Sequence, residues 1–142
     1  MPKKKTETQL TEQTKEQKPK KTRNGAYNKR RGNSYETKIA KELRDLGFTG
    51  VVTSRSESKQ ADNNKVDLVD TEGKLPFYPQ LKRTINTPQY FKIREESTVD
   101  PQKFVLFWNK QEAKETNICS IGECVILDKN FFYELIKQYV KD

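Results

Sequence analysis

Three side chains within the segment 66–82 (VDLVDTEGKLPFYPQLK) have the types and spacing needed to act on a phosphodiester: Asp67, Gln80 and Lys82. We expect this segment to form two strands joined by a tight turn. Side chains alternate along a strand, so Gln80 and Lys82 share the face that carries Asp67. Gln80 is then the diagonal neighbour of Asp67, roughly 7–8 Å away by Cα, which is close enough to share a metal ion. The spacing indicates a metal-dependent phosphodiesterase site. The alternative is a cross-strand ion pair between Asp67 and Lys82, which contributes little at a surface.

The turn of this predicted hairpin lies at residues 71–74. Gly73 takes a positive φ without steric cost, so a two-residue loop of Glu72 and Gly73 would place Asp67 opposite Tyr78. Pro79 cannot donate to a ladder, so we expect an edge or a bulge there.

The first helix is predicted over Gly32–Gly47, with Asn33 or Ser34 as its cap and Gly47 as its end. Its apolar positions recur at helical spacing and form one face: Tyr35, Ile39, Ala40, Leu43 and Leu46. Glu36 lies beside this face in the expected first turn. Two interpretations stay open for Glu36: a carboxylate favoured by the helix dipole, or a ligand of the metal or its bound water.

A strand is predicted over Phe48–Arg55, followed by a polar loop, SRSESKQADNNK. This loop is either ordinary surface or a substrate contact that includes Arg55, Ser56 and Ser58. Arg55 could clamp a phosphate by its fork geometry.

A short helix is expected to start at Thr87 and Pro88. Basic residues with interleaved aromatic side chains gather around it, as on surfaces that meet nucleic acid: Lys82, Arg83, Lys92 and Arg94. The alternative is an ordinary amphipathic helix with a solvated face.

The remainder predicts a strand at KFVLFWN (residues 103–109), buried on both faces. A polar turn should follow at Lys110–Glu115, then short strands at Thr116–Ser120 and Cys124–Leu127. Asp128 should cap a final helix whose apolar positions cover the sheet. The order of elements predicts an α/β domain of about 110 residues.

The 142 residues carry a formal charge of +8, which suggests a polyanionic partner. Residues 1–31 hold eleven basic and three acidic residues, which leaves seventeen of each sign in residues 32–142. We expect 1–31 to be a disordered basic tail and 32–142 to be the folded domain. The tail either contacts DNA phosphates or serves as a solubilising segment, a cargo tag or a nuclear address.

The chain has no histidine, which excludes histidine bases, histidine metal ligands and Ser-His or Cys-His nucleophiles within one chain. Cys119 and Cys124 could bridge along a hairpin, but free buried thiols in a reducing compartment are the expectation. The sequence shows neither a signal peptide nor an apolar run of the ~20 residues that a membrane span needs. We expect an intracellular, cytoplasmic protein, in the host's cytoplasm if a phage encodes it.

Over about residues 32–107, the sequence resembles the restriction-endonuclease-like nucleases, which are named for a PD…(D/E)xK signature. It is most similar to Holliday-junction resolvases of the archaeal and phage type. The resemblance rests on four stretches: GNSYETKIAKELRDLGF, SRSES, VDLVD and QLK. It matches the helix glutamate to Glu36, the arginine-serine turn to Arg55 with Ser56 or Ser58, the aspartate to Asp67, and the acid-x-lysine pair to Gln80 and Lys82.

The sequence departs from the signature at two positions. Val66 precedes Asp67 in place of proline, as is common among resolvases. Gln80 stands in the acid position, where an amide supplies one weak oxygen ligand and no charge. Some nucleases of the methylated-DNA restriction type carry the same Q-x-K form.

The resemblance implies a restriction-endonuclease-like core: a mixed β-sheet flanked by helices. It implies Mg²⁺ or Mn²⁺ held by Asp67, Gln80 and Glu36, because hard cations prefer oxygen ligands. Lys82 would orient or deprotonate the attacking water, or stabilise phosphate charge. Arg83 and Lys92 would join the arginine-serine turn in contacting DNA. Cutting a four-way junction symmetrically implies a homodimer, joined through the terminal helix or the KFVLFWN strand.

Three functions follow as expectations. The first is a structure-selective DNA endonuclease that resolves junctions in recombination and repair. The second is a catalytically silent nuclease fold kept for binding DNA, and the third is a nuclease of the same fold that cuts ordinary duplex.

Overall fold

The structure, a computed structural model, describes residues 26, 29–57 and 66–140. The chain divides into two units, residues 1–33 and 34–142, and the architecture below is that of the second. Most of the predicted disordered tail and Ser58 lie outside the described residues, whereas residues 29–31 are helical. None of the helices in the described part of the chain is long and apolar enough to cross a membrane.

The second unit opens with helical residues 34–45, which we call the first helix. Its predicted apolar face is confirmed at its four buried positions, Tyr35, Ile39, Ala40 and Leu43. Leu46 lies beyond the last helical turn and is exposed. The predicted caps are wrong because Asn33 and Ser34 are themselves helical. Gly47 has a φ of 121°, which confirms the predicted end of the helix.

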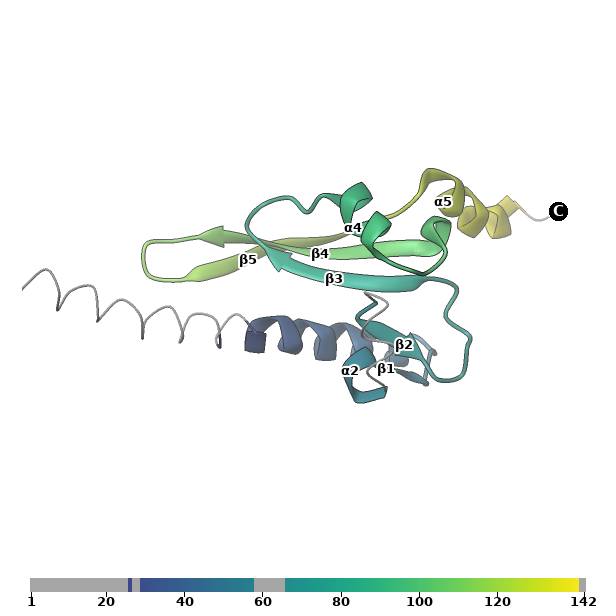
Figure 1. The fold of residues 1–142 in the computed structure, drawn as a ribbon, viewed down its shortest axis with the longest axis horizontal. Helices are drawn as coiled ribbons and strands as arrows, with labels where there is room; N and C mark the ends of the chain where they lie inside the picture. Colours follow the sequence, from purple (N-terminus) through teal and green to yellow (C-terminus); the bar gives the residue numbers. More distant parts are fainter. Residues whose placement is uncertain (1–25, 27–28, 58–65, 141–142) are drawn as a thin grey trace, which may run out of the picture. The chain divides into compact units, whose positions relative to one another are not determined.

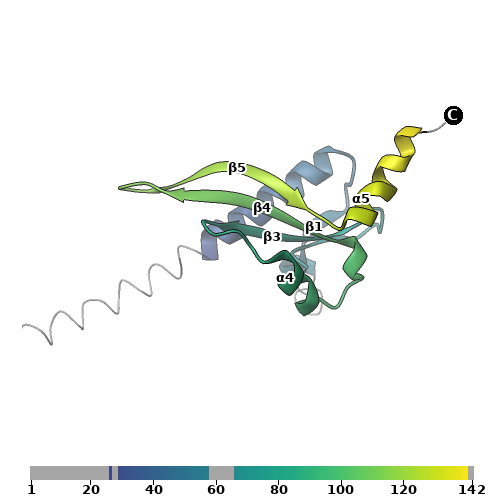
Figure 2. The same cartoon turned by 90° about the horizontal axis from the view of Figure 1, so that it is seen from above.

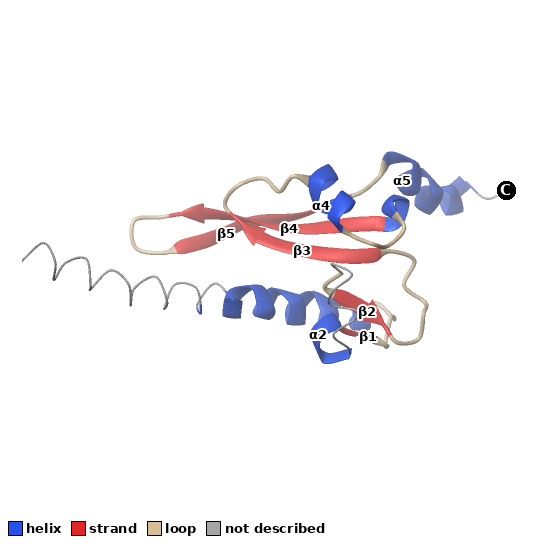
Figure 3. Ribbon diagram, in the orientation of Figure 1, coloured by secondary structure: helices blue, strands red, loops and turns tan. Residues whose placement is uncertain are grey.

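A two-stranded antiparallel ladder follows, made by β1 (Val51–Thr53) and β2 (Leu68–Asp70). Between them, α2 (Ser54–Glu57) begins directly after β1. The predicted strand over Phe48–Arg55 is therefore too long, since Ser54 and Arg55 are helical. Figure 3 shows α2 beside this pair of strands.

The larger sheet has three strands in the order β3-β4-β5. β3 (Tyr78–Thr84) runs parallel to β4 (Phe104–Ala113), and α4 (Tyr90–Glu96) and the 3₁₀ turn η1 (Pro101–Lys103) lie in the connection between them. Thr87 and Pro88 do not begin α4, which starts at Tyr90. β3 is an outer strand, which agrees with the edge expected at Pro79.

β5 (Ile118–Ile126) pairs antiparallel with β4 and replaces the two short strands expected there. The turn predicted at Lys110–Glu115 is wrong in position, because β4 continues to Ala113 through an irregularity at Lys110 and Gln111. Figure 2 shows the three strands side by side.

α5 (Lys129–Ile136) and the 3₁₀ turn η2 (Lys137–Val140) end the described chain. Asp128 caps α5 as predicted, since its Oδ2 accepts from the Phe131 backbone N–H at 3.1 Å. Only Phe131 of α5 is buried, so the expectation that this helix covers the sheet is wrong. The other large apolar side chains of this end are exposed: Phe132, Tyr133, Ile136, Tyr139 and Val140.

Two apolar clusters lie on opposite faces of the larger sheet (Figure 1). The first joins the first helix to Val51, Leu68 and Leu81. The second gathers Tyr90, Phe104 and Leu106 beneath α4. The predicted α/β architecture, a mixed sheet flanked by helices, is confirmed at this level.

Candidate functional site

The chain between β2 and β3 does not form the predicted hairpin. β2 pairs with β1, and β3 pairs with β4. Asp67 bonds through its backbone N–H to the oxygen of Pro79 at 3.0 Å, so Tyr78 is not its ladder partner. The predicted glycine turn is present, with a φ of 68° at Gly73, whose N–H donates to the oxygen of Asp70 at 3.1 Å.

Asp70 explains why this connection is wider than a two-residue loop. Its Oδ1 accepts from the N–H of Glu72 at 2.9 Å, and its Oδ2 accepts from Lys74 and Leu75 at 2.8 Å each. Burial alone would raise the pKa of Asp70, but these three N–H donors outweigh it and lower the pKa. The carboxylate thereby fixes residues 70–75 as a side-chain-bonded turn.

Asp67 lies where α2, β2 and β3 meet. Its backbone oxygen accepts from the N–H of Ser54 at 2.8 Å, and its Oδ2 accepts from the N–H of Leu81 at 2.7 Å. Leu81 stands between Gln80 and Lys82, so the carboxylate is held against the stretch of β3 that carries both predicted partners. The structure thus places Asp67 next to this stretch of β3 by a route other than a hairpin.

Gln80 and Lys82 lie on the face of β3 opposite the first helix. Leu81 packs in the cluster of the first helix, and alternation directs its neighbours to the other face. Gln80 is 9% exposed, and its Oε1 has no hydrogen-bond partner in the described part of the chain. Buried polar atoms are nearly always bonded. A buried amide oxygen without a donor is of the ligand type that Mg²⁺ or Mn²⁺ prefers.

Glu36 forms an ion pair with Arg55, with 3.2 Å between Oε1 and Nη2. The Glu36 side chain is 16% exposed, so it does not point into solvent. The interpretation of Glu36 as a helix-dipole carboxylate is wrong, because helical residues precede it from position 29. Glu36 belongs to the helix that packs on the Leu81 face. Among the described residues, no three acidic or cysteine side chains are grouped to hold a metal ion.

The predicted DNA-contacting residues are dispersed. Ser56 donates from Oγ to the oxygen of Thr53 at 2.8 Å and is exposed next to Arg55. Lys92 is exposed on α4. Arg83 is half-buried, and alternation places it on the face of β3 opposite Lys82.

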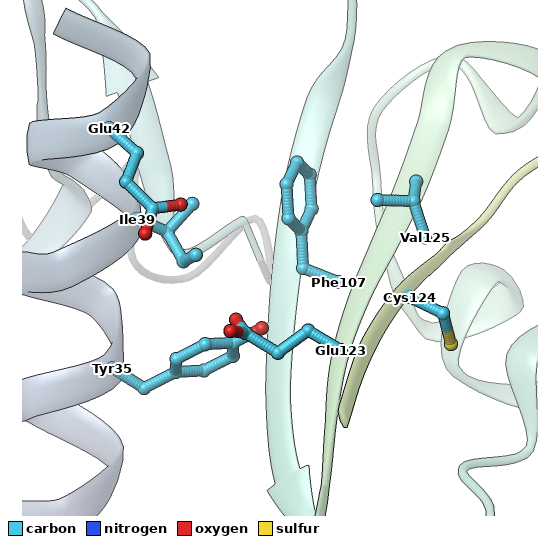
Figure 4. Close-up of a pocket in the computed structure, with 7 residues that line it drawn as sticks. All are labelled: Tyr35, Ile39, Glu42, Phe107, Glu123, Cys124 and Val125. Atoms are coloured by element: carbon cyan, nitrogen blue, oxygen red, sulfur yellow. The ribbon is translucent and has the colours of Figure 1, made fainter. Parts of the chain in front are cut away.

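A separate cavity of about 220 Å³ lies between the first helix and the strands β4 and β5 (Figure 4). Figure 4 shows the Glu123 carboxylate close to the Tyr35 hydroxyl, and Lys38 Nζ binds Glu123 Oε2 at 2.9 Å. Burial first, and then the nearby Glu123, raise the pKa of Tyr35. None of the residues predicted for the phosphodiesterase site lines this cavity.

Cys119 and Cys124 are free, as expected, but they are half-buried and exposed rather than buried. No sequence pattern distinguished Ser54, a serine near the end of a predicted strand, although it is 1% exposed and its N–H donates to the Asp67 oxygen. Comparison with protein-family models, with curated proteins and with solved structures finds no match to this chain.

Proposed function

We propose that this chain is a metal-dependent DNA endonuclease with a restriction-endonuclease-like core, of the Holliday-junction-resolvase type. One observation carries the proposal: the Asp67 carboxylate is bonded to β3 at Leu81, the neighbour in sequence of Gln80, whose buried amide oxygen lacks a donor among the described residues. The mixed sheet flanked by helices agrees with what the resemblance implies.

In this proposal, Asp67 and Gln80 hold one Mg²⁺ or Mn²⁺ through oxygen atoms. When bound, the cation supplies positive charge to the phosphate in the transition state. Lys82, half-buried on the Gln80 face, orients the attacking water or takes its proton. The water attacks phosphorus as the bond to the leaving oxygen breaks.

Arg55 is the proposed phosphate clamp. Its guanidinium is bonded to Glu36 through Nε and Nη2, while its side chain is 41% exposed. Glu36, the third predicted metal ligand, contributes to the proposal by holding this guanidinium in place. The exposed guanidinium can then donate hydrogen bonds to a DNA phosphate from the solvent side.

A junction cutter needs two sites related by twofold symmetry. β4 is bonded to strands on both sides, so the KFVLFWN strand has no free edge for pairing. The exposed apolar side chains of α5 and η2 support a homodimer through the C-terminal end instead.

A silent DNA-binding fold is the second candidate function. Two observations favour it. Gln80, which stands in the acid position of the signature on β3, is neutral, and Glu36 is held in an ion pair with Arg55. Such a protein would bind branched DNA through the basic tail and surface without cutting it.

A cleavage assay separates these functions. We expect paired, symmetric nicks in a four-way junction with Mg²⁺, and none in EDTA. Asp67→Asn should abolish nicking and retain binding, whereas the exposed control Asp45→Asn should cut normally. Tight binding without nicks supports the silent fold, and equal cutting of linear duplex supports a duplex nuclease. Full activity of Asp67→Asn would remove the site assignment.

A further inference from the structure

We propose that Ser54 supplies, through its hydroxyl oxygen, a further ligand of the divalent cation held by Asp67 and Gln80. This inference rests on the proposed function and adds a neutral oxygen to the same site. Three oxygen atoms from three segments of the chain would then surround one cation.

The first observation is the state of the Ser54 hydroxyl. Ser54 is 1% exposed, yet its Oγ has no hydrogen-bond partner within the described ranges. Leaving a buried hydroxyl unbonded costs about 1–3 kcal/mol on mutational scales. A hydroxyl that is buried at this cost and left without a partner is a candidate ligand for a cation.

The second observation is the position of Ser54 relative to Asp67. Thr53 is the ladder partner of Leu68, and the next residues are joined by the bond from the Ser54 N–H to the Asp67 oxygen at 2.8 Å. Residues opposite each other in an antiparallel pair project to the same face. Ser54, the first residue of α2, and Asp67, the residue before β2, are therefore bonded neighbours at the end of this ladder.

The third observation is that Gln80 adjoins a residue bonded to the Asp67 side chain, because the Leu81 N–H donates to Asp67 Oδ2. Its neighbour Leu81 packs in the same cluster as Leu68, so alternation directs Gln80 away from the first helix. Ser54 Oγ and Gln80 Oε1 are both buried side-chain oxygens without a partner in the described residues. Each belongs to a segment that is hydrogen-bonded to Asp67. Both of these oxygens therefore belong to residues that are, or adjoin, a hydrogen-bond partner of Asp67.

The chemistry of this set specifies the class of ligand. One carboxylate and two neutral oxygens suit a hard divalent cation such as Mg²⁺, Mn²⁺ or Ca²⁺. A soft metal would require a sulfur or imidazole ligand, and none of the three side chains provides one.

The test measures cation binding in the full-length protein without DNA. Titration with Mn²⁺ alone should show Ser54→Ala binding at least about tenfold more weakly than the parent. In EDTA, this variant should melt no lower than the parent, because it loses only an unpaired hydroxyl. Ser97→Ala, a serine after α4, is the matched control and should bind Mn²⁺ normally.

A thiol substitution distinguishes a direct ligand from a packing role. In a chain carrying Cys119→Ser and Cys124→Ser, Ser54→Cys should shift preference toward Cd²⁺ over Mg²⁺ by at least about tenfold, since thiolates select soft metals. A packing role predicts no change in this preference. The parent's own Mn²⁺ titration keeps the two proposals distinguishable. A parent that binds Mn²⁺ while Ser54→Ala binds it equally well overturns only the Ser54 inference. A parent that binds no divalent cation overturns the metal-dependent function as well.

Discussion

Asp67 accepts a hydrogen bond from the backbone N–H of Leu81 at 2.7 Å, so a side chain takes the place of a strand partner on the outer edge of β3. This bond gives Asp67 a structural role that can be separated from its chemistry. Asp67→Ala leaves the Leu81 N–H without its acceptor and should lower the free energy of unfolding by about 1–3 kcal/mol. Asp67→Asn keeps an oxygen at that position and should lose less than Asp67→Ala. Urea unfolding of both variants checks this, and equal losses would contradict the role of the bond.

Gln80→Glu should make the stability of the protein depend on metal. A carboxylate at a position that is 9% exposed is costly to ionise without a counter-charge, so the variant should unfold more easily in EDTA. A second carboxylate should also tighten Mg²⁺ binding by about tenfold or more, because affinity rises with ligand charge. Thermal melts with and without Mg²⁺ measure both effects.

Gln111→Glu is the control for Gln80→Glu. Gln111 is 1% exposed in β4, and its Nε2 donates to Asn109 Oδ1 at 2.7 Å. This variant should be destabilised equally with and without Mg²⁺. Rescue of Gln111→Glu by Mg²⁺ would show that the effect at position 80 does not report a site.

Gly50→Ala should be strongly destabilising. A Cβ at this position would lie 2.6 Å from Asp70 Oδ1 and 2.8 Å from both Thr71 Oγ1 and Glu72 Cγ. Relief would disturb the bonds that Thr71 makes to the Gly50 oxygen through its N–H and its hydroxyl. We expect a loss of about 1–3 kcal/mol in denaturant unfolding, the range for overpacked sites. Gly122→Ala is the control, since no described atom beyond its two chain neighbours lies within 4 Å of the added Cβ.

Asp70 should contribute to acid unfolding. Its folded-state pKa is lowered, so its stabilising contribution is fully present above the unfolded pKa of about 3.9 and is lost as pH falls through the folded value. Asp70→Asn should flatten the stability profile below about pH 4 and weaken the turn near pH 7. Because the chain has no histidine, no side chain with an ordinary pKa near 6.5 titrates between these conditions. Unfolding free energies measured from pH 3 to pH 7 test this, and an unchanged acid slope would contradict it.

Deleting residues 1–31 should weaken DNA binding and its salt dependence. The deleted segment carries eleven basic and three acidic residues, and the remaining chain has no net charge. The logarithm of the binding constant falls with the logarithm of the salt concentration with a slope of about 0.9 for each phosphate neutralised. The slope should therefore become shallower by about 0.9 for each phosphate contact that the deletion removes. Fluorescence anisotropy across a salt series measures it. An unchanged slope would assign binding to the folded unit alone.

Periodic patterns predicted two features of the helices correctly. The buried stripe of the first helix and the Asp128 cap of α5 follow from spacing and local hydrogen bonding, and both are confirmed. The exposed surface of α5 could not be foreseen in the same way. An apolar helical pattern indicates that a face can be buried, but not what buries it.

The pairing of the strands was harder to predict because it depends on contacts distant in sequence. The short segment around Gly73 has the composition of a hairpin turn, yet three bonds to the Asp70 side chain widen it, and β2 pairs with β1. Asp67 still reaches β3 through its side chain and its backbone N–H. The sequence therefore predicted that Asp67 lies near the segment of Gln80 and Lys82 because of a hairpin, whereas the structure joins them through the bonds of Asp67 to β3.

The outer strand β5 has a practical implication for handling the protein. It leaves one edge unpaired in the described sheet and exposes Ile118, Ile121 and Val125. Bare edges with apolar side chains template the addition of further strands. Concentrated samples should therefore tend to aggregate through this edge. Ile121→Lys should keep them monodisperse, because a charged side chain on an edge strand opposes pairing with another chain.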